Sequence, residues 1–273
     1  MSERVRLPAL RCLRYEVALN GWKILKETIN DFSLWRLIEY PWCTDALDLR
    51  PGDLVLDIGT GTATFPQMLA REGVSTVVLE LDADRVRWQQ RKSRETSRPG
   101  DSTVYPVVAD ATALPLKDGV GRRVSAISSL EHIPDDEAVG REIGRVLADG
   151  GVAVITIPYT RAERADFFKG VRKFRRVERN AFEQEGKAGS FFRFYDDQDI
   201  EETYIVPSGG RVVRWGGFGR RVLNGMYHET KLTKYWRRYV LKDWLLAKIV
   251  HPLEERFGQG TEPLYVMFKI VKD

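Results

Sequence analysis

The chain has 273 residues, of which 43 are basic and 39 acidic, so its formal charge is only +4. This length allows one α/β domain of about 150–200 residues with additions, and the charge is too small to demand a polyanionic partner. Two cysteines and no charged-then-apolar leader favour a reducing, cytoplasmic compartment. No apolar run reaches the ~18 residues of a membrane span.

Residues 9–42 predict two amphipathic helices ahead of the first strand. Their apolar faces would consist of Leu10, Leu13 and Val17, and of Trp22, Leu25 and Ile29. Pro41 is expected to end the helical run. We therefore expect a helical cap over residues 1–44, followed by the main domain over residues 45–273.

An apolar run at residues 55–58 contains Asp57 and opens into Gly59-Thr60-Gly61. A buried parallel strand is typically such a run, and glycines after it let the backbone approach a ligand at the next helix N-terminus. The pattern therefore predicts a nucleotide-type cofactor site, although a tight strand-to-helix turn would also use these glycines.

The same motif argues against a dinucleotide. That fingerprint has a small residue three positions after the second glycine, where this chain has Thr64. A carboxylate at Asp57 would also repel a pyrophosphate. S-adenosylmethionine fits better, because it carries a sulfonium, an ammonium and a ribose diol but no phosphate.

A second strand at residues 75–80 ends in Glu80, 21 positions after Gly59. A carboxylate at this distance from the glycine turn accepts hydrogen bonds from ribose hydroxyls. Three more strands are expected at residues 103–111, 124–129 and 152–158, with a helical face at 142–147 that Asp149-Gly150-Gly151 stops. Strands that alternate with helices in this way predict a parallel α/β sheet.

In this order the motifs resemble those of the class I S-adenosylmethionine-dependent methyltransferases, in particular the broad small-molecule (methyltransferase type 11-like) group. The resemblance covers roughly residues 45–160 and rests on residues 57–62, Glu80, Asp110-Ala111, residues 128–134 and residues 147–158. It implies a Rossmann-like, seven-stranded, mostly parallel sheet with helices on both faces and an antiparallel last strand.

The resemblance also implies the cofactor-binding residues. These are Asp57, Gly59, Thr60, Gly61, Glu80, Leu81, Asp110, Ala111 and Ser128. The glycines would pass under the methionine and ribose, Asp57 would engage the ammonium, and Glu80 would hold the ribose diol. Asp110, with the Ala111 amide beside it, would accept from the adenine amino group, while Ser128 would border the methyl group. An isolated acid at such a position can also be a helix cap, the role expected for Asp82 and Asp84.

Two insertions interrupt the expected core. Residues 159–195 are basic and aromatic, and their spacing suggests a helix whose apolar face includes Phe167, Val171, Phe174 and Phe182. Such a segment is either a lid over the acceptor or a solvated charged face. Residues 216–262 predict a long apolar helix, buried in its own domain or serving as a lid or homodimer seam. Residues 211–215 and 263–271 predict strands six and seven around it.

The chemistry follows from the cofactor that the motifs imply. Methyl transfer from a sulfonium needs alignment and, for a hydroxyl acceptor, removal of a proton. The Asn/Asp-Pro-Pro-aromatic tetrad of nucleic-acid amine methyltransferases is absent, and both cysteines lie before residue 50. The sequence thus favours methylation of a small-molecule acceptor, with oxygen the favoured acceptor atom. An RNA-directed methyltransferase and an aminopropyl transferase stay open as alternatives.

His132 follows the fourth strand and is the only histidine among the cofactor motifs, so it is the candidate general base. The alternative is that His132 only begins a helix. His228 and His251 are expected to be ordinary loop or packing residues. With three histidines and two cysteines scattered along the chain, no dedicated metal site is expected.

Overall fold

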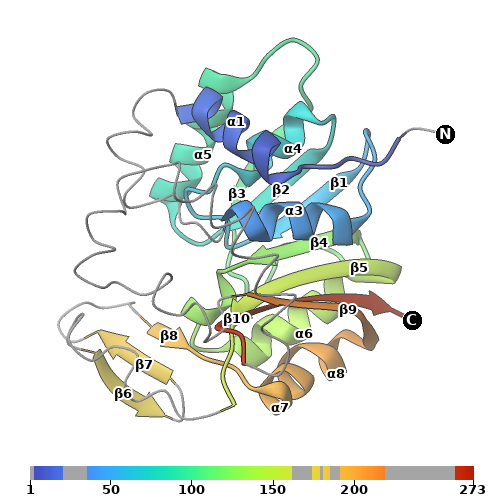
Figure 1. The fold of residues 1–273 in the computed structure, drawn as a ribbon. Helices are drawn as coiled ribbons and strands as arrows, with labels where there is room; N and C mark the ends of the chain where they lie inside the picture. Colours follow the sequence, from blue (N-terminus) through green and yellow to red (C-terminus); the bar gives the residue numbers. More distant parts are fainter. Residues whose placement is uncertain (1–2, 21–35, 162–173, 179–180, 185–190, 219–261) are drawn as a thin grey trace.

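The computed structural model describes residues 3–20, 36–161, 174–178, 181–184, 191–218 and 262–273. Within these ranges the central feature is a seven-stranded sheet in the order β3-β2-β1-β4-β5-β10-β9 (Figure 1). Its strands are β1 (Leu54–Ile58), β2 (Ser75–Glu80), β3 (Val104–Val108), β4 (Gly121–Ile127), β5 (Leu147–Pro158), β9 (Gly210–Phe218) and β10 (Tyr265–Lys272). The first five strands are parallel and β10 is antiparallel to both of its neighbours. The predicted fold class is confirmed.

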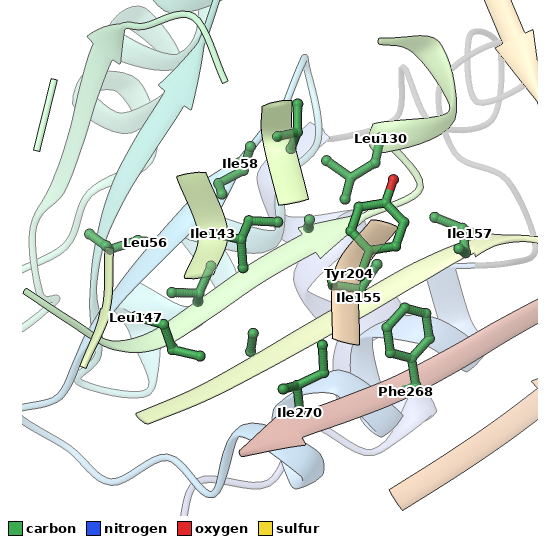
Figure 2. Close-up of a cluster of buried hydrophobic side chains, with 14 of the residues drawn as sticks. Leu56, Ile58, Leu130, Ile143, Leu147, Ile155, Ile157, Tyr204, Phe268 and Ile270 are labelled. Carbon is green, nitrogen blue, oxygen red and sulfur yellow. The ribbon is translucent and has the colours of Figure 1, made fainter. Parts of the chain in front are cut away.

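Helices cover both faces of the sheet because alternate strand residues point to opposite sides. On one face Val55, Val152 and Val154 pack with α1 (Ala9–Asn20), α3 (Arg36–Leu47) and α4 (Phe65–Arg71). On the other face Leu56 and Ile155 pack with α6 (Asp136–Val146) and its neighbours. Figure 2 shows this second cluster, in which Ile143 and Tyr204 lie over the strand residues. The two apolar layers hold the strand ends in a fixed arrangement.

Helix α5 (Ala83–Thr96) follows β2 and contacts β2 and β3. Asp82 caps its N-terminus by accepting hydrogen bonds from the backbone N–H groups of Asp84 and Arg85. The capping role predicted for Asp82 is therefore confirmed. Asp84 lies in the first turn, where a carboxylate favours the positive end of the helix dipole.

The N-terminal helix exists, and of the predicted apolar face Leu13 packs against the core, but Leu10 and Val17 do not. Cys12 and Leu19 are buried, whereas Leu10 and Val17 are exposed. The buried face also contains the charged residue Glu16, which hydrophobic spacing alone could not select. Residues 22–29, the second predicted face, lie outside the described residues.

The prediction that Pro41 ends a helix is also wrong, because Pro41 lies inside α3. A proline in a helix interior removes one backbone hydrogen bond. Here the buried side chains around it, among them Leu37, Tyr40 and Leu47, fix the helix against the sheet. This packing outweighs the loss of the one backbone hydrogen bond at Pro41.

Three short segments between Phe174 and Arg193 form a small antiparallel sheet in a region where the sequence predicted a helical face. Its strands are β6 (Phe174–Glu178), β7 (Ala181–Gln184) and β8 (Phe191–Arg193), in that order (Figure 1). Phe182 and Phe191 are buried, and Phe182 lies edge-on to Phe194 at 6.4 Å. Strand pairing between β7 and β8, in which Phe182 lies opposite Phe192, organises these aromatics. Residues 162–173, which carry much of the basic charge, lie outside the described ranges.

A second helical segment packs on α6 at very close range. It comprises α7 (Asp197–Ile200), the π-helical turn η2 (Glu201–Ile205) and α8 (Val206–Ser208). Asp196 starts it with a reciprocal capping box to Asp199. A Cβ on Gly140 would lie 1.7 Å from the Thr203 carbonyl oxygen. The close approach of the two segments therefore requires glycine at this position.

We predict that Gly140→Ala lowers the free energy of unfolding by about 1–3 kcal/mol, the usual range for overpacking. Helix propensity alone would give the opposite sign, a gain of up to ~1 kcal/mol. Denaturant titration measures the difference. Arg141→Ala, at a side chain that is 63% exposed, is the matched control and should stay within about 0.5 kcal/mol. Equal or greater stability of Gly140→Ala would contradict this packing.

Candidate functional site

The carboxyl ends of β1, β2, β4 and β5 meet at one edge of the sheet, which is where open α/β sheets bind ligands. The predicted motifs lie at or just after the ends of β1, β2 and β4, and Asp110-Ala111 follows the end of β3. The register Tyr265↔Pro158 brings the start of the antiparallel β10 to the same edge. The sequence order and the sheet order therefore converge on a single site.

The glycine turn is held from two sides. Gly59 has φ of +70°, and a Cβ there would lie 2.7 Å from the Ser129 Cβ, so packing against the β4 end already requires glycine. Gly61 has φ of +60°, and within the described part of the chain the atom nearest to where its Cβ would be is Arg85 Nη1, at 3.8 Å. The Gly61 amide donates to Glu80 Oε2 at 2.8 Å. The turn is thus joined directly to the β2 carboxylate.

Asp57 is buried, and both of its carboxylate oxygens accept hydrogen bonds. Ser125 Oγ donates to Oδ1 at 2.5 Å and Thr60 Oγ1 donates to Oδ2 at 2.6 Å. Burial raises the pKa of Asp57 to about 6, although the two hydrogen bonds lower it. Thr60, which the resemblance places among the cofactor-binding residues, therefore uses its hydroxyl to bind the Asp57 carboxylate. The carboxylate remains a strong attraction for a nearby cation.

Glu80 lies buried at the end of β2, as predicted. Besides the Gly61 amide it accepts from the Asp82 amide at 3.1 Å, which fixes the orientation of the carboxylate. Asp110 is exposed and accepts from the backbone and side chain of Thr112, whose hydrogen bonds lower the pKa of Asp110. Leu81 is 66% exposed. Glu80 and Gly61 are in direct contact, whereas the Asp110 carboxylate is bonded to Thr112.

Ser128 occupies the end of β4 with φ of +46°, a left-handed conformation that is uncommon for serine. Its hydroxyl donates to Glu39, which also accepts from Thr156 Oγ1 at 2.7 Å. The Ser128 amide bonds to the Thr156 hydroxyl at 2.9 Å and to its carbonyl at 3.0 Å. This network fixes the strained residue beside the glycine turn.

The sequence reasoning missed Arg36 and Glu39, which α3 brings to this edge. Arg36 Nη1 donates to Glu39 at 3.0 Å and to the Ile127 carbonyl at 3.3 Å. Glu39 is fully buried and the Arg36 side chain is only 19% exposed. A charged pair inside an otherwise apolar helix was the available sequence signal, because buried charges are rare unless they are paired.

Glu16 of α1 is a second residue that the sequence reasoning missed. Its carboxylate accepts from Thr64, which follows the glycine turn, and from Asn20 at 2.6 Å. Burial raises the pKa of Glu16 to about 7. The first helix is therefore tied to the loop that begins α4, as a cap over this end of the sheet would require.

His132 lies in η1 (Leu130–His132), a single 3-10 turn after β4. Its Nδ1 is 3.1 Å from the Phe191 carbonyl oxygen in β8, and its ring lies 5.4 Å from that of Phe192. The side chain is exposed, while the adjacent Glu131 is buried and its Oε2 has no hydrogen-bond partner among the residues that the structure describes. Burial raises the pKa of Glu131 to about 6. Two groups able to accept a proton thus follow the fourth strand.

The polar groups at this edge of the sheet suit S-adenosylmethionine. Two buried carboxylates flank a glycine turn, and anionic oxygens are the partners of an ammonium and of hydroxyl donors. The same carboxylates disfavour a phosphate. Arg36 adds one buried guanidinium, the partner that a carboxylate needs.

Two other site classes receive no support from the described residues. No three His, Cys, Asp or Glu side chains gather there as a metal-binding group. Within the same ranges, no helix combines the length and apolar character needed to cross a bilayer.

Residues 56–155 match the profile of a family described as "Methyltransferase domain". A methyltransferase of Streptomyces halstedii, GfsG, is 36% identical over 115 residues, which are 39% of this chain and 38% of that protein. A demethylmenaquinone methyltransferase of Mycolicibacterium gilvum is 35% identical over 112 residues, 41% of this chain and 44% of that protein. The chain thus spans about two fifths of the length of these relatives.

Solved structures extend the likeness of fold over the whole chain. Geranyl diphosphate methyltransferase aligns with a TM-score of 0.58 and 15% identity, covering 86% of this chain and 77% of that one. The [4+2]-cyclase SpnF aligns with a TM-score of 0.58 and 16% identity, covering 100% and 99%. The family match, the sheet order and the acids at the strand ends agree on a class I S-adenosylmethionine-dependent methyltransferase domain that includes residues 56–155.

Proposed function

We propose that the protein transfers the methyl group of S-adenosylmethionine to a hydroxyl group of a small, largely apolar acceptor. The observation that carries the cofactor assignment is the Gly61 amide bonded to the buried Glu80 carboxylate, beside the buried Asp57. When bound, the cofactor supplies a methyl group already activated on a sulfonium. The protein then has to align the acceptor and accept its proton.

Each cofactor-binding role rests on a defined position. Glu80 holds the ribose diol, Asp57 attracts the ammonium directly or through water, and Arg36 pairs with the methionine carboxylate. Gly59, Thr60 and Ser128 keep the turn and the β4 end in place through the contacts described above. Asp110, Ala111 and Leu81 border the adenine.

The acceptor class is inferred from relatives and from the surroundings of His132. Relatives with 32–35% identity over 105–112 residues are named for demethylmenaquinone, a methyl-phytyl-hydroquinone and 27-O-demethylrifamycin SV. The ring of Phe192 in β8 lies beside His132, and that of Phe194 lies next to Phe192. These surroundings suit an apolar acceptor with one ionisable hydroxyl.

His132 takes the acceptor proton. Because a carbonyl oxygen only accepts, the bond to Phe191 needs the proton on Nδ1, which leaves Nε2 with its lone pair. Tyr159 is less suitable, since its hydroxyl donates to Asp197 and burial raises its pKa to about 12. Glu131, buried and carrying an oxygen without a hydrogen-bond partner in the described part of the chain, ranks second.

We predict that Glu80→Ala weakens S-adenosylhomocysteine binding about tenfold to a hundredfold. The expected loss of ~1.5–3 kcal/mol is that of hydrogen bonds to a charged group. Isothermal titration calorimetry measures it. Glu137→Ala, at a side chain that is 76% exposed, is the control and should bind as the unmodified protein does. Unchanged affinity in Glu80→Ala would refute the ribose assignment.

Cofactor affinity should also depend on pH through Asp57. An ammonium prefers the ionised carboxylate, and burial raises the pKa of Asp57 to about 6. Affinity should therefore be full well above pH 6 and fall by up to about tenfold per unit below it, because protonation competes with binding. Calorimetry between pH 5 and 8 measures this slope. In Asp57→Asn the slope attributable to this group should disappear, and an unchanged slope would contradict the role.

We expect His132→Ala to lower kcat by ~10²–10⁴-fold while S-adenosylhomocysteine affinity changes less than about twofold, since a general base acts in the chemical step. Candidate hydroxyl acceptors with apolar frames, followed by mass spectrometry, provide the assay. His132→Gln, which keeps a polar side chain but no base, should fail equally. A loss of only a few-fold would remove His132 from the mechanism and turn attention to Glu131.

A further inference from the structure

The small β6-β7-β8 sheet reaches the candidate base through β8. The Phe191 carbonyl oxygen lies 3.1 Å from His132 Nδ1, and the ring of Phe192 lies edge-on to the imidazole at 5.4 Å. Phe192 in turn lies 5.2 Å from Phe194. The orientation of the imidazole is therefore set by a strand that is remote in the sequence.

A buried polar cluster fixes β8 to the helix that follows His132. Asp136, the first residue of α6, accepts from Arg193 Nη1 at 2.6 Å and from Tyr195 Oη at 2.9 Å. Tyr204 Oη donates to Tyr195 Oη at 3.2 Å. The Asp136 side chain is only 2% exposed and that of Arg193 is 20% exposed. We name Asp136, Arg193 and Tyr195 the β8 clamp.

The ion pair of the clamp is largely shielded from water. A charge-assisted bond between a guanidinium and a carboxylate is strong when both are shielded from water. Arg193 also lies over the Phe191 ring, with its Cζ 5.6 Å from the ring centroid. It thus joins the residue whose carbonyl meets His132 to the helix that begins four residues after His132.

We propose that Asp136 and Arg193 are positioning residues, which hold the Phe191 carbonyl against His132 so that the neutral imidazole keeps its proton on Nδ1 and presents Nε2 to the acceptor. This inference deepens the proposed function, because it rests on the base role of His132. Neither residue touches the acceptor. Their effect on turnover passes through the tautomer and orientation of one ring.

The direct test is nuclear magnetic resonance of histidine labelled with nitrogen-15. The chain has three histidines, so His228→Gln and His251→Gln assign the His132 signals. In the unmodified protein, neutral His132 should show the Nδ1–H form. Asp136→Asn keeps the size of the side chain but removes its charge, and should bring the Nε2–H form into the mixture. Glu137→Gln, next along the same helix and 76% exposed, is the matched control.

Turnover gives the second readout. Asp136→Asn should lower kcat about tenfold to a hundredfold with little change in KM, part of the ~10²–10⁴ that a general base contributes. In a His132→Ala background the same substitution should cost nothing further, because residues that act through one group are not additive. Should Asp136→Asn fail to fold, Tyr195→Phe removes one clamp hydroxyl and should change the tautomer in the same direction.

An Nε2–H form in the unmodified protein, or a tautomer that neither variant changes, would overturn the proposal. So would a full additional loss of kcat in the double variant. If His132→Ala keeps its turnover, the base role fails, but the tautomer measurement still decides whether the clamp orients His132. The two failures are therefore distinguishable.

Discussion

The buried carboxylates at the carboxyl edge of the sheet are the constraint on which the rest of this structure depends. Asp57, Glu80, Glu39 and Glu16 all lie there, each less than a tenth exposed. An ionised carboxylate out of water is costly unless donors surround it. The donors come from the glycine turn, from serine and threonine hydroxyls and from Arg36. The fold is arranged to supply them.

This constraint gives the N-terminal helices their role. Arg36 and Glu39 reach the β4 end from α3, and Glu16 reaches Thr64 from α1. A cap that served only to cover apolar strands would need no charged residues on its buried face. The helices instead bring polar partners to the carboxyl edge of the sheet, and α1 accordingly buries Glu16 and exposes Leu10 and Val17.

The sequence predicted the parts of the fold that local patterns determine. β2 was found at its predicted bounds, and strands ending near Asp57 and Ser128 were expected because apolar runs closed by polar residues are unmistakable. The small β6-β7-β8 sheet was mistaken for a helix, since aromatics interleaved with basic residues satisfy both periods over short lengths. Pro41 was predicted to end a helix, but it lies inside α3, because the packing of α3 on the sheet outweighs local helix propensity.

The candidate site residues also divide into those that local sequence patterns predict and those that only tertiary contacts reveal. Glu80 and Asp57 could be predicted because each lies at a fixed distance from a glycine turn on a strand end. Arg36, Glu39 and the β8 clamp could not, because they meet the site only through tertiary contacts between residues far apart in sequence. The Ser128–Glu39 pair, for example, spans 89 positions.

The likeness of fold to a [4+2]-cyclase as well as to methyltransferases shows that the sheet alone does not determine the reaction. The acids at β1 and β2 can bind the cofactor whatever chemistry follows. A site can accept a proton only if it holds a base in the correct orientation; a site without such a base only encloses its substrate. The candidate position for this base is the group that follows β4. In the function proposed here that group is His132, and the carbonyl that its ring meets belongs to β8, outside the seven-stranded sheet. Reaction chemistry should therefore vary with the insertions while cofactor binding stays with the sheet.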